Sequence, residues 1–283
     1  MLSIFLLKST ISNITFGLGL YIFILTFTPT FASANPINTN ENVTDIIQHC
    51  YYKNQGSDQR ATLKIILKNK EGKVQQGEYL RLWKDYRGDG QLEDKSVLYT
   101  LSPIEQAGVN FLRWSYISSA KLPPEQWVYL PELRIVRRVA QRDPRDMAWG
   151  LTDDDLRIRD IEEDQHRLIS SQQTKQGTIY LVETKPLSAE SVYQKWHTRY
   201  LKQHDWSDCR PIETVYYSKF SKTKSKTVTF TWLVIDDVWV WDEVKIIDKK
   251  TNAEVIYRTI EAKVNTEIKD SQFKERQLKR APR

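Results

Sequence analysis

The sequence predicts a mainly β protein, an antiparallel sandwich or barrel, and three features indicate this class. Apolar and polar residues alternate with a period of two along most of the chain. About a dozen such segments follow one another at regular spacing, with turn signals between many of them. Long helical patterns are almost absent, and no linker or fixed-period repeat divides the chain. We therefore expect one sheet-rich domain rather than alternating helices and strands.

The N-terminus has the three parts of a secretory signal. Its first 40 residues contain no acidic residue, and Lys8 is their one basic residue. An apolar run from Ile14 to Phe27 follows, and a small-x-small cleavage site ends at Ala34. We expect residues 1–34 to be a cleaved signal peptide and residues 35–283 to form one periplasmic domain. The alternative is a retained membrane anchor, although the run is shorter than the roughly 20 residues that span a bilayer.

The expected elements begin with a short helix from Val43 to Tyr52. In the first strand Leu63, Ile65 and Leu67 share one face. In the second, Leu80 and Leu82 face away from the intervening residues, and a turn at Arg87–Gly90 ends it. The alternation predicts further strands at 97–101, 109–117, 127–130, 135–139, 166–173, 178–184, 192–201, 212–219, 226–235, 238–247 and 254–264.

Two segments depart from the alternation. Residues 141–165 are dense in charge, and we expect a long loop carrying a short helix near Asp153–Leu156. The acidic run Asp153–Asp155 is better explained as the first turn of that helix than as a metal site. Residues 270–283 are basic and are expected to be frayed or helical.

Two cysteines, Cys50 and Cys209, lie in the exported part. In an oxidising compartment an even pair indicates a disulfide, and two unpaired thiols are the alternative. Together with His49 and His204 they are a conceivable zinc set, but neither pair has the close spacing of zinc-finger ligands. We therefore predict no metal site and no cofactor.

The charge and the motifs exclude several function classes. The full chain carries +6, and loss of Lys8 with the signal leaves +5. This modest basic balance suits an anionic lipid surface or an acidic partner and does not by itself indicate a nucleic-acid partner. No nucleophile–base set, metalloprotease motif or phosphate-binding glycine loop is visible, so we predict that the protein is not an enzyme.

Several strands carry apolar residues on both faces. Phe111 is followed by Leu112, Trp127 by Val128, and Val240 by Trp241. An antiparallel strand with one wet face should be polar on that face, so both faces of these strands are expected to be covered. The second face either lines a cavity of a curved sheet or is buried as ordinary core.

Residues 77–156 resemble the outer-membrane lipoprotein-sorting proteins, a LolA-like group of periplasmic carriers. The centre of the resemblance, residues 97–139, is specific in order and spacing, and the C-terminal half is weaker. The family's loop often has a Gly-Ser-Asp-Phe run, whereas this chain has residues 149–153 of different sequence, Trp-Gly-Leu-Thr-Asp. The matching residues are Ser102-Pro103, Gly108 to Phe111, Trp127, Tyr129, Leu130, Pro131, Arg134, Arg137, Arg138, Asp155, Leu156, Phe273, Arg276 and Leu278.

The resemblance implies a half-open, incomplete antiparallel β-barrel with a short helical lid, as in LolA and LolB. It also implies an apolar cavity that binds acyl chains of a lipoprotein or lipid and moves them towards the outer membrane. An inner-membrane transporter and an outer-membrane acceptor would be the partners. The alternative is a non-catalytic envelope module that docks a membrane transporter or another protein.

The candidate site residues follow from these expectations. Each cavity candidate could instead be plain core packing, because a one-residue error in register moves the whole set to the other face. The arginine-rich strand could meet lipid phosphates or an acidic partner, or could be a solvated strand that pairs with the acidic segment 153–164. The cavity candidates are Leu80, Leu82, Leu98, Phe111, Trp127 and Tyr129, and the anion candidates are Arg134, Arg137 and Arg138.

Overall fold

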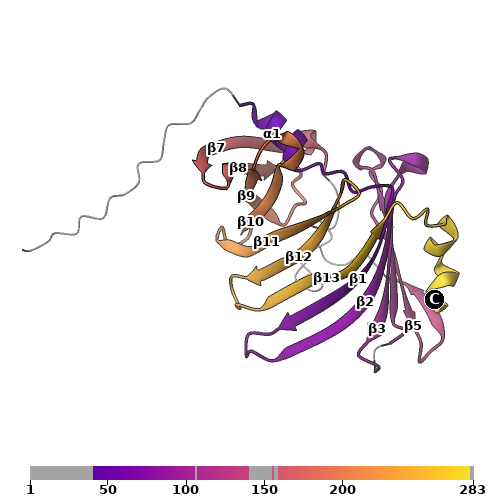
Figure 1. Ribbon diagram of the computed structural model, residues 1–283. Helices are drawn as coiled ribbons and strands as arrows, with labels where there is room; N and C mark the ends of the chain where they lie inside the picture. The colour runs from indigo at the N-terminus through magenta and orange to yellow at the C-terminus, as the bar shows by residue number, and fades with distance from the viewer. Residues whose placement is uncertain (1–40, 106, 140–154, 156–158, 281–283) are drawn as a thin grey trace, which may run out of the picture. The chain divides into compact units, whose positions relative to one another are not determined.

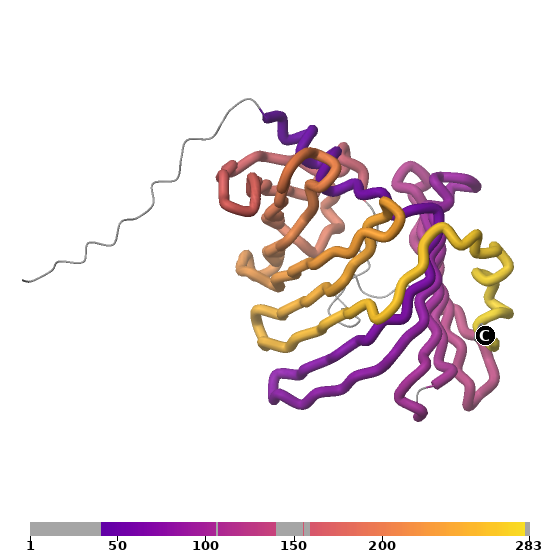
Figure 2. Tube along the Cα trace, in the orientation of Figure 1, coloured from indigo at the N-terminus to yellow at the C-terminus, as the bar shows by residue number. Residues whose placement is uncertain are grey.

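The computed structural model describes residues 41–105, 107–139, 155 and 159–280. Thirteen strands of this part form one antiparallel sheet, and they lie side by side in Figures 1 and 2. The strand order is β6-β5-β4-β3-β2-β1-β13-β12-β11-β10-β9-β8-β7, so β6 and β7 are the edges and the sheet is not closed. The predicted mainly β, half-open antiparallel architecture is therefore confirmed.

From β4 to β13 the strand boundaries lie within two residues of those predicted from the alternation, whereas β3 begins at Leu92, five residues before the predicted start. The strands are β1 (Asp58–Lys68), β2 (Val74–Asp85), β3 (Leu92–Ser102), β4 (Asn110–Tyr116), β5 (Glu125–Leu130), β6 (Ile135–Arg138), β7 (Asp164–Thr174), β8 (Gly177–Pro186), β9 (Tyr193–Lys202), β10 (Arg210–Ser218), β11 (Lys224–Ile235), β12 (Val238–Asp248) and β13 (Glu254–Val264). The helical elements are α1 (Val43–Cys50) and the short 3₁₀ turns η1 (Asp89–Gln91), η2 (Ser118–Ala120), η4 (Ile161–Glu163), η5 (Trp206–Asp208), η6 (Asp270–Phe273) and η7 (Glu275–Lys279).

Helix α1 forms where the sequence predicts it, for local reasons. The side chain of Asn42 accepts a hydrogen bond from the Thr44 backbone N–H at 3.0 Å, and so caps the first turn. Ile46, Ile47 and Cys50 are buried, and they recur at the spacing of one helical face. The helix therefore packs on the sheet through one apolar stripe.

The two segments that departed from the alternation differ in outcome. Strand β7 begins at Asp164, two residues before the expected strand, and η4 precedes it. The expected helix near Asp153 lies outside the described residues, apart from Asp155. The C-terminal segment is ordered in η6 and η7, because Phe273 and Leu278 are buried against the sheet.

The two faces of the sheet are covered by different segments. We call the face that carries α1 the helix face, and the face that carries η6 and η7 the tail face. On the helix face a cross-strand row runs through Val182, Thr198, Thr214, Val228, Ile246 and Val255. On the tail face a row runs through Leu82, Val97, Leu112 and Trp127. Figure 1 shows α1 beside β7–β9 and the C-terminal segment beside β3 and β5.

Candidate functional site

The six cavity candidates do not lie together. Register assigns each to a face, because residues directly opposite in neighbouring strands share a face and successive residues alternate. Leu98 and Phe111 lie opposite each other on the helix face. The other four lie on the tail face: Leu80, Leu82, Trp127 and Tyr129. The alternation separates the two faces within one strand, but it does not show which faces of neighbouring strands lie together.

The tail-face residues are enclosed by the chain itself. Phe273 and Leu278 are 0% and 1% exposed and pack into the cluster that contains Leu82 and Trp127. Polar contacts hold the segment in place. The Trp114 indole N–H donates to the Phe273 carbonyl at 3.0 Å, and the Asn110 side chain donates to the Leu278 carbonyl at 2.6 Å. The late Phe-x-x-Arg-x-Leu motif is therefore a packing anchor, a role that sequence reasoning did not assign to it.

The helix face of the same strands carries an apolar patch. Leu98, Phe111 and Val128 lie directly opposite one another on β3, β4 and β5, and Leu130 lies opposite Ile135 one step further along. All five side chains are half-buried. We call these five residues the apolar patch. Sequence reasoning missed three of them, although the pairs Phe111–Leu112 and Trp127–Val128 had indicated that both faces are apolar.

A buried polar group adjoins the apolar patch on the helix face. Asp94, Arg113 and Ser115 are 6%, 4% and 2% exposed. The Arg113 Nε–H donates to Ser115 Oγ at 3.2 Å, and Ser115 lies 3.5 Å from Asp94 Oδ1. Burial raises the pKa of Asp94 to about 6, while the charges of Arg113 and Arg81 oppose the rise. Two guanidinium groups thus face two carboxyl groups here, because Asp85 on β2 lies opposite Asp94.

The three candidate arginines occupy different environments. Arg134 has a φ of +54° in the turn between β5 and β6. Arg138 is on the tail face, 3.0 Å from Glu125 and over the ring of Trp127. Arg137 is exposed and lies opposite Val128 on the helix face. Of the three, Arg137 is placed beside the apolar patch.

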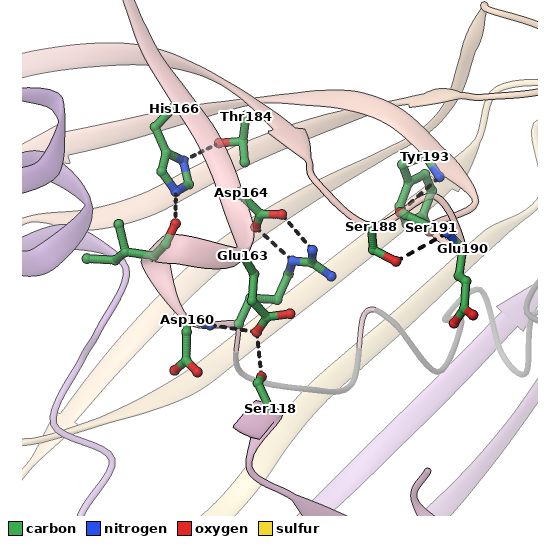
Figure 3. Close-up of polar contacts among 12 residues, drawn as sticks. Ser118, Asp160, Glu163, Asp164, His166, Thr184, Ser188, Glu190, Ser191 and Tyr193 are labelled. Carbon is green, nitrogen blue, oxygen red and sulfur yellow. Dashed lines mark hydrogen bonds and ion pairs between the residues drawn. The ribbon is translucent and has the colours of Figure 1, made fainter. Parts of the chain in front are cut away.

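The helix-face edge near β7 is held by a polar network, shown in Figure 3. The Asp164 carboxylate pairs with Arg159 at 2.5 Å, and both side chains are buried. The Glu163 carboxylate accepts from the Asp160 backbone N–H at 2.9 Å and from the Ser118 hydroxyl at 2.5 Å. Ser118 lies between β4 and β5, so this contact joins the two halves of the open sheet.

A disulfide joins Cys50 of α1 to Cys209, which follows η5. These sulfurs are therefore not thiolate ligands, which removes the conceivable zinc set. Among the described residues, no three His, Cys, Asp or Glu side chains are grouped as a metal would require. Within the same residues, no helix has the length and apolar character needed to cross a bilayer.

A family model described as "-like: Uncharacterized protein" matches residues 92–280, about two thirds of the sequence, and the chain belongs to the family that this model describes. No curated protein matches the chain.

Three solved structures share the fold. An outer membrane lipoprotein-sorting protein domain from Vibrio parahaemolyticus is 22% identical, with a TM-score of 0.69, over 84% of this chain and 96% of that one. A DUF1329 family protein from Desulfovibrio piger is 19% identical, with a TM-score of 0.71, over 83% and 95%. A LolA superfamily protein from Nitrosomonas europaea is 14% identical, with a TM-score of 0.60, over 83% and 98%. The chain therefore shares the fold of these three proteins.

Proposed function

We propose that the protein is a periplasmic carrier that binds acyl chains of a lipoprotein or lipid and helps to move them towards the outer membrane. The apolar patch carries this proposal. Leu98, Phe111 and Val128 form a continuous apolar row across three strands and remain half-buried. The opposite face of the same strands is covered by η6 and η7. In this proposal the apolar patch, on the other face, receives the ligand.

The energetics suit a carrier. Each buried methylene contributes about 0.8 kcal/mol, so a long acyl chain gains on the order of 10 kcal/mol when it leaves water. Release requires that the carrier bind the acyl chain less tightly than complete burial would. Half-buried side chains on an open sheet would cover only part of the chain and so meet this requirement. Arg137, which is exposed beside the patch, would favour a ligand whose head group is anionic.

The cellular setting is part of the same proposal. Residues 1–34 would be a cleaved export signal, and residues 35–283 would be a single carrier domain. The Cys50–Cys209 disulfide is typical of an oxidising compartment such as the periplasm. An inner-membrane transporter would deliver the cargo, and an outer-membrane acceptor would receive it. The protein would need no catalytic group or cofactor for this role.

A fluorescent fatty acid tests the proposal directly. We expect the purified protein to bind the probe saturably, and the Phe111→Glu variant to bind it at least about tenfold more weakly, because a carboxylate in the patch opposes both the chain and its head group. Phe220→Glu is the matched control, since Phe220 is 67% exposed in the β10–β11 loop. A wild-type protein that takes up no probe, and carries no lipid in native mass spectrometry, would contradict the carrier proposal.

A second candidate is a non-catalytic envelope module that docks a protein. The β5–β6 turn favours it, because Leu133 is 56% exposed beside Glu132 and Arg134. Pull-down from solubilised membranes separates the candidates. A docking module would lose its partner in Leu133→Ser and keep it in Phe111→Glu, whereas a carrier would lose probe binding only in Phe111→Glu.

A further inference from the structure

Three turns at one end of the sheet, between β8 and β9, between β10 and β11 and between β12 and β13, are joined by hydrogen bonds. The Lys219 backbone N–H donates to the Val192 carbonyl at 3.0 Å, and the Lys219 ammonium group donates to the Ala189 carbonyl. The Lys249 backbone N–H donates to the Ser225 carbonyl at 2.8 Å, at the start of β11. Figure 2 shows the second and third of these turns side by side. We call the three turns the basic rim, which comprises residues 187–192, 219–223 and 249–253.

The basic rim is positively charged, and the opposite ends of the same strands are not. Four exposed lysines and one carboxylate, that of Glu190, give the rim a formal charge of +3. The turns at the other end, residues 175–176, 203–209 and 236–237, contain one lysine and four aspartates, which give −3 with His204 neutral. The strands β7–β13 therefore carry opposite charges at their two ends. The rim lysines are Lys219, Lys222, Lys249 and Lys250, and the aspartates are Asp205, Asp208, Asp236 and Asp237.

Two large apolar side chains are exposed among these lysines. Leu187, in the first turn of the rim, is 58% exposed, and Phe220, in the second, is 67% exposed. The hydrogen bonds of Lys219 join the two turns that carry them. A single exposed apolar residue is ordinary on a protein surface. Two of them on joined turns, among a surplus of lysines, make an amphipathic surface.

The chemistry of the basic rim favours a lipid surface over an acidic protein. All of its cations are lysines, whereas protein–protein interfaces are enriched in arginine and depleted in lysine. A lysine is a compact charge on a flexible stem, which suits a diffuse layer of lipid phosphates. Each basic residue close to an anionic bilayer strengthens binding about fivefold. Exposed apolar side chains are accepted at the boundary between the head groups and the acyl chains.

We propose that the basic rim docks the protein on an anionic lipid bilayer, with Lys222 and Lys250 beside the phosphates and Leu187 and Phe220 at the boundary with the acyl chains. The acidic turns then point away from the bilayer, which repels them, so the protein takes one orientation on the surface. Docking through this rim does not depend on what the apolar patch binds, so the two proposals can fail separately.

Co-sedimentation of the purified protein with lipid vesicles tests the docking surface. The probes are vesicles of phosphatidylcholine alone and of phosphatidylcholine mixed with phosphatidylglycerol. We expect binding to the anionic vesicles to be at least about tenfold stronger at low salt, and to weaken as salt screens the charges. The Lys222→Gln/Lys250→Gln variant should bind the anionic vesicles about twentyfold more weakly, because it removes two charges from the rim.

A variant with the same net charge separates the rim from a general effect of charge. Lys121→Gln/Lys175→Gln removes two exposed lysines from turns at the opposite end of the antiparallel sheet. This control should bind the anionic vesicles as the wild type does. A loss as large as that of Lys222→Gln/Lys250→Gln would overturn the assignment of the rim as the docking surface.

The apolar part of the rim has its own test. Leu187→Ser/Phe220→Ser should weaken binding to the anionic vesicles at least about tenfold, because two side chains lose their place at the acyl boundary. Leu122→Ser/Val234→Ser is the matched control, since it removes side chains that are 48% and 54% exposed near the other end of the sheet. Unchanged binding by Leu187→Ser/Phe220→Ser would contradict the proposed insertion.

The remaining outcomes also decide the question. No binding to the anionic vesicles would overturn the proposal. Binding of polyglutamate instead, weakened in Lys222→Gln/Lys250→Gln, would assign the rim to an acidic protein and not to a bilayer. Because every substituted side chain is exposed, all variants should melt as the wild type does, so a loss of vesicle binding is not a loss of fold. Fatty-acid uptake in the absence of vesicles should be the same in all of them.

Discussion

The two halves of the sheet, β7–β10 and β2–β5, are covered on opposite faces. In β7–β10 the helix face is covered by α1, and the tail face is polar: the Glu183 carboxylate there accepts hydrogen bonds from Arg167, Lys195 and His197. In β2–β5 the tail face is covered by η6 and η7, and the helix face carries the half-buried apolar patch.

This difference explains why only one half suggests a ligand. The tail face of β7–β10 is charged, as expected for an antiparallel sheet with one solvent-exposed face. In β3–β5 one side packs on the chain's own C-terminal segment, and the other side carries the half-buried apolar patch next to the buried Asp94, Arg113 and Ser115. A contiguous apolar patch marks a binding site more strongly than a single apolar residue does.

The largest expected effect is on β7–β10, the half of the sheet that α1 covers; we call it the α1 half. A Cys50→Ser/Cys209→Ser variant releases a cross-link between residues 159 positions apart. We expect it to lower the free energy of unfolding by about 3–5 kcal/mol, because the unfolded chain regains the entropy of a long loop. Urea unfolding measures the loss, and amide exchange should rise first in β7–β10. Faster exchange in β3–β5 instead would mean that the disulfide does not stabilise the α1 half in particular.

A slightly smaller effect is expected on β2–β5, the half of the sheet that η6 and η7 cover. Phe273→Ala should lower the free energy of unfolding by about 3–4 kcal/mol, since it empties a site that is 0% exposed. Phe220→Ala removes the same side chain from a position that is 67% exposed and should change stability by less than about 0.5 kcal/mol. Similar midpoints for the two variants would contradict the assignment of η6 and η7 as a packed cover.

The smallest expected effect is a pH-dependent loss of stability on the polar tail face of β7–β10. Hydrogen bonds from Lys195 and His197 hold the pKa of Glu183 well below its ordinary value of 4.5. A depressed carboxyl pKa contributes stability that is present above pH 4.5 and is lost as the pH falls through the folded value. Glu183→Gln should therefore cost about 1–2 kcal/mol at pH 7, after allowance for its exposed partners, and progressively less below pH 4.5.

Thermal melts of Glu183→Gln at pH 7 and at pH 3 measure this dependence. Glu213→Gln is the control, because its carboxylate is one-third exposed and lies 3.8 Å from Arg199. A gap between wild type and Glu183→Gln that widened in acid would contradict the expected direction.

Much of the fold was predictable because strand alternation is local. The period of two placed β13 at its observed bounds, residues 254–264, and it separated Leu80 and Leu82 from Tyr79 and Trp83. The short helix expected at Val43–Tyr52 is α1, which ends at Cys50. The candidate site was less predictable: Leu98 and Phe111 do share a face, but Leu80 and Trp127 lie on the other.

The sequence by itself determined the class, the strand positions and which residues of a strand share a face, since each depends on neighbours along the chain. Tertiary structure alone decided which face α1 and the C-terminal segment cover, because that choice depends on contacts between residues 100–200 positions apart. It placed Asn110 against Leu278 and Cys50 against Cys209.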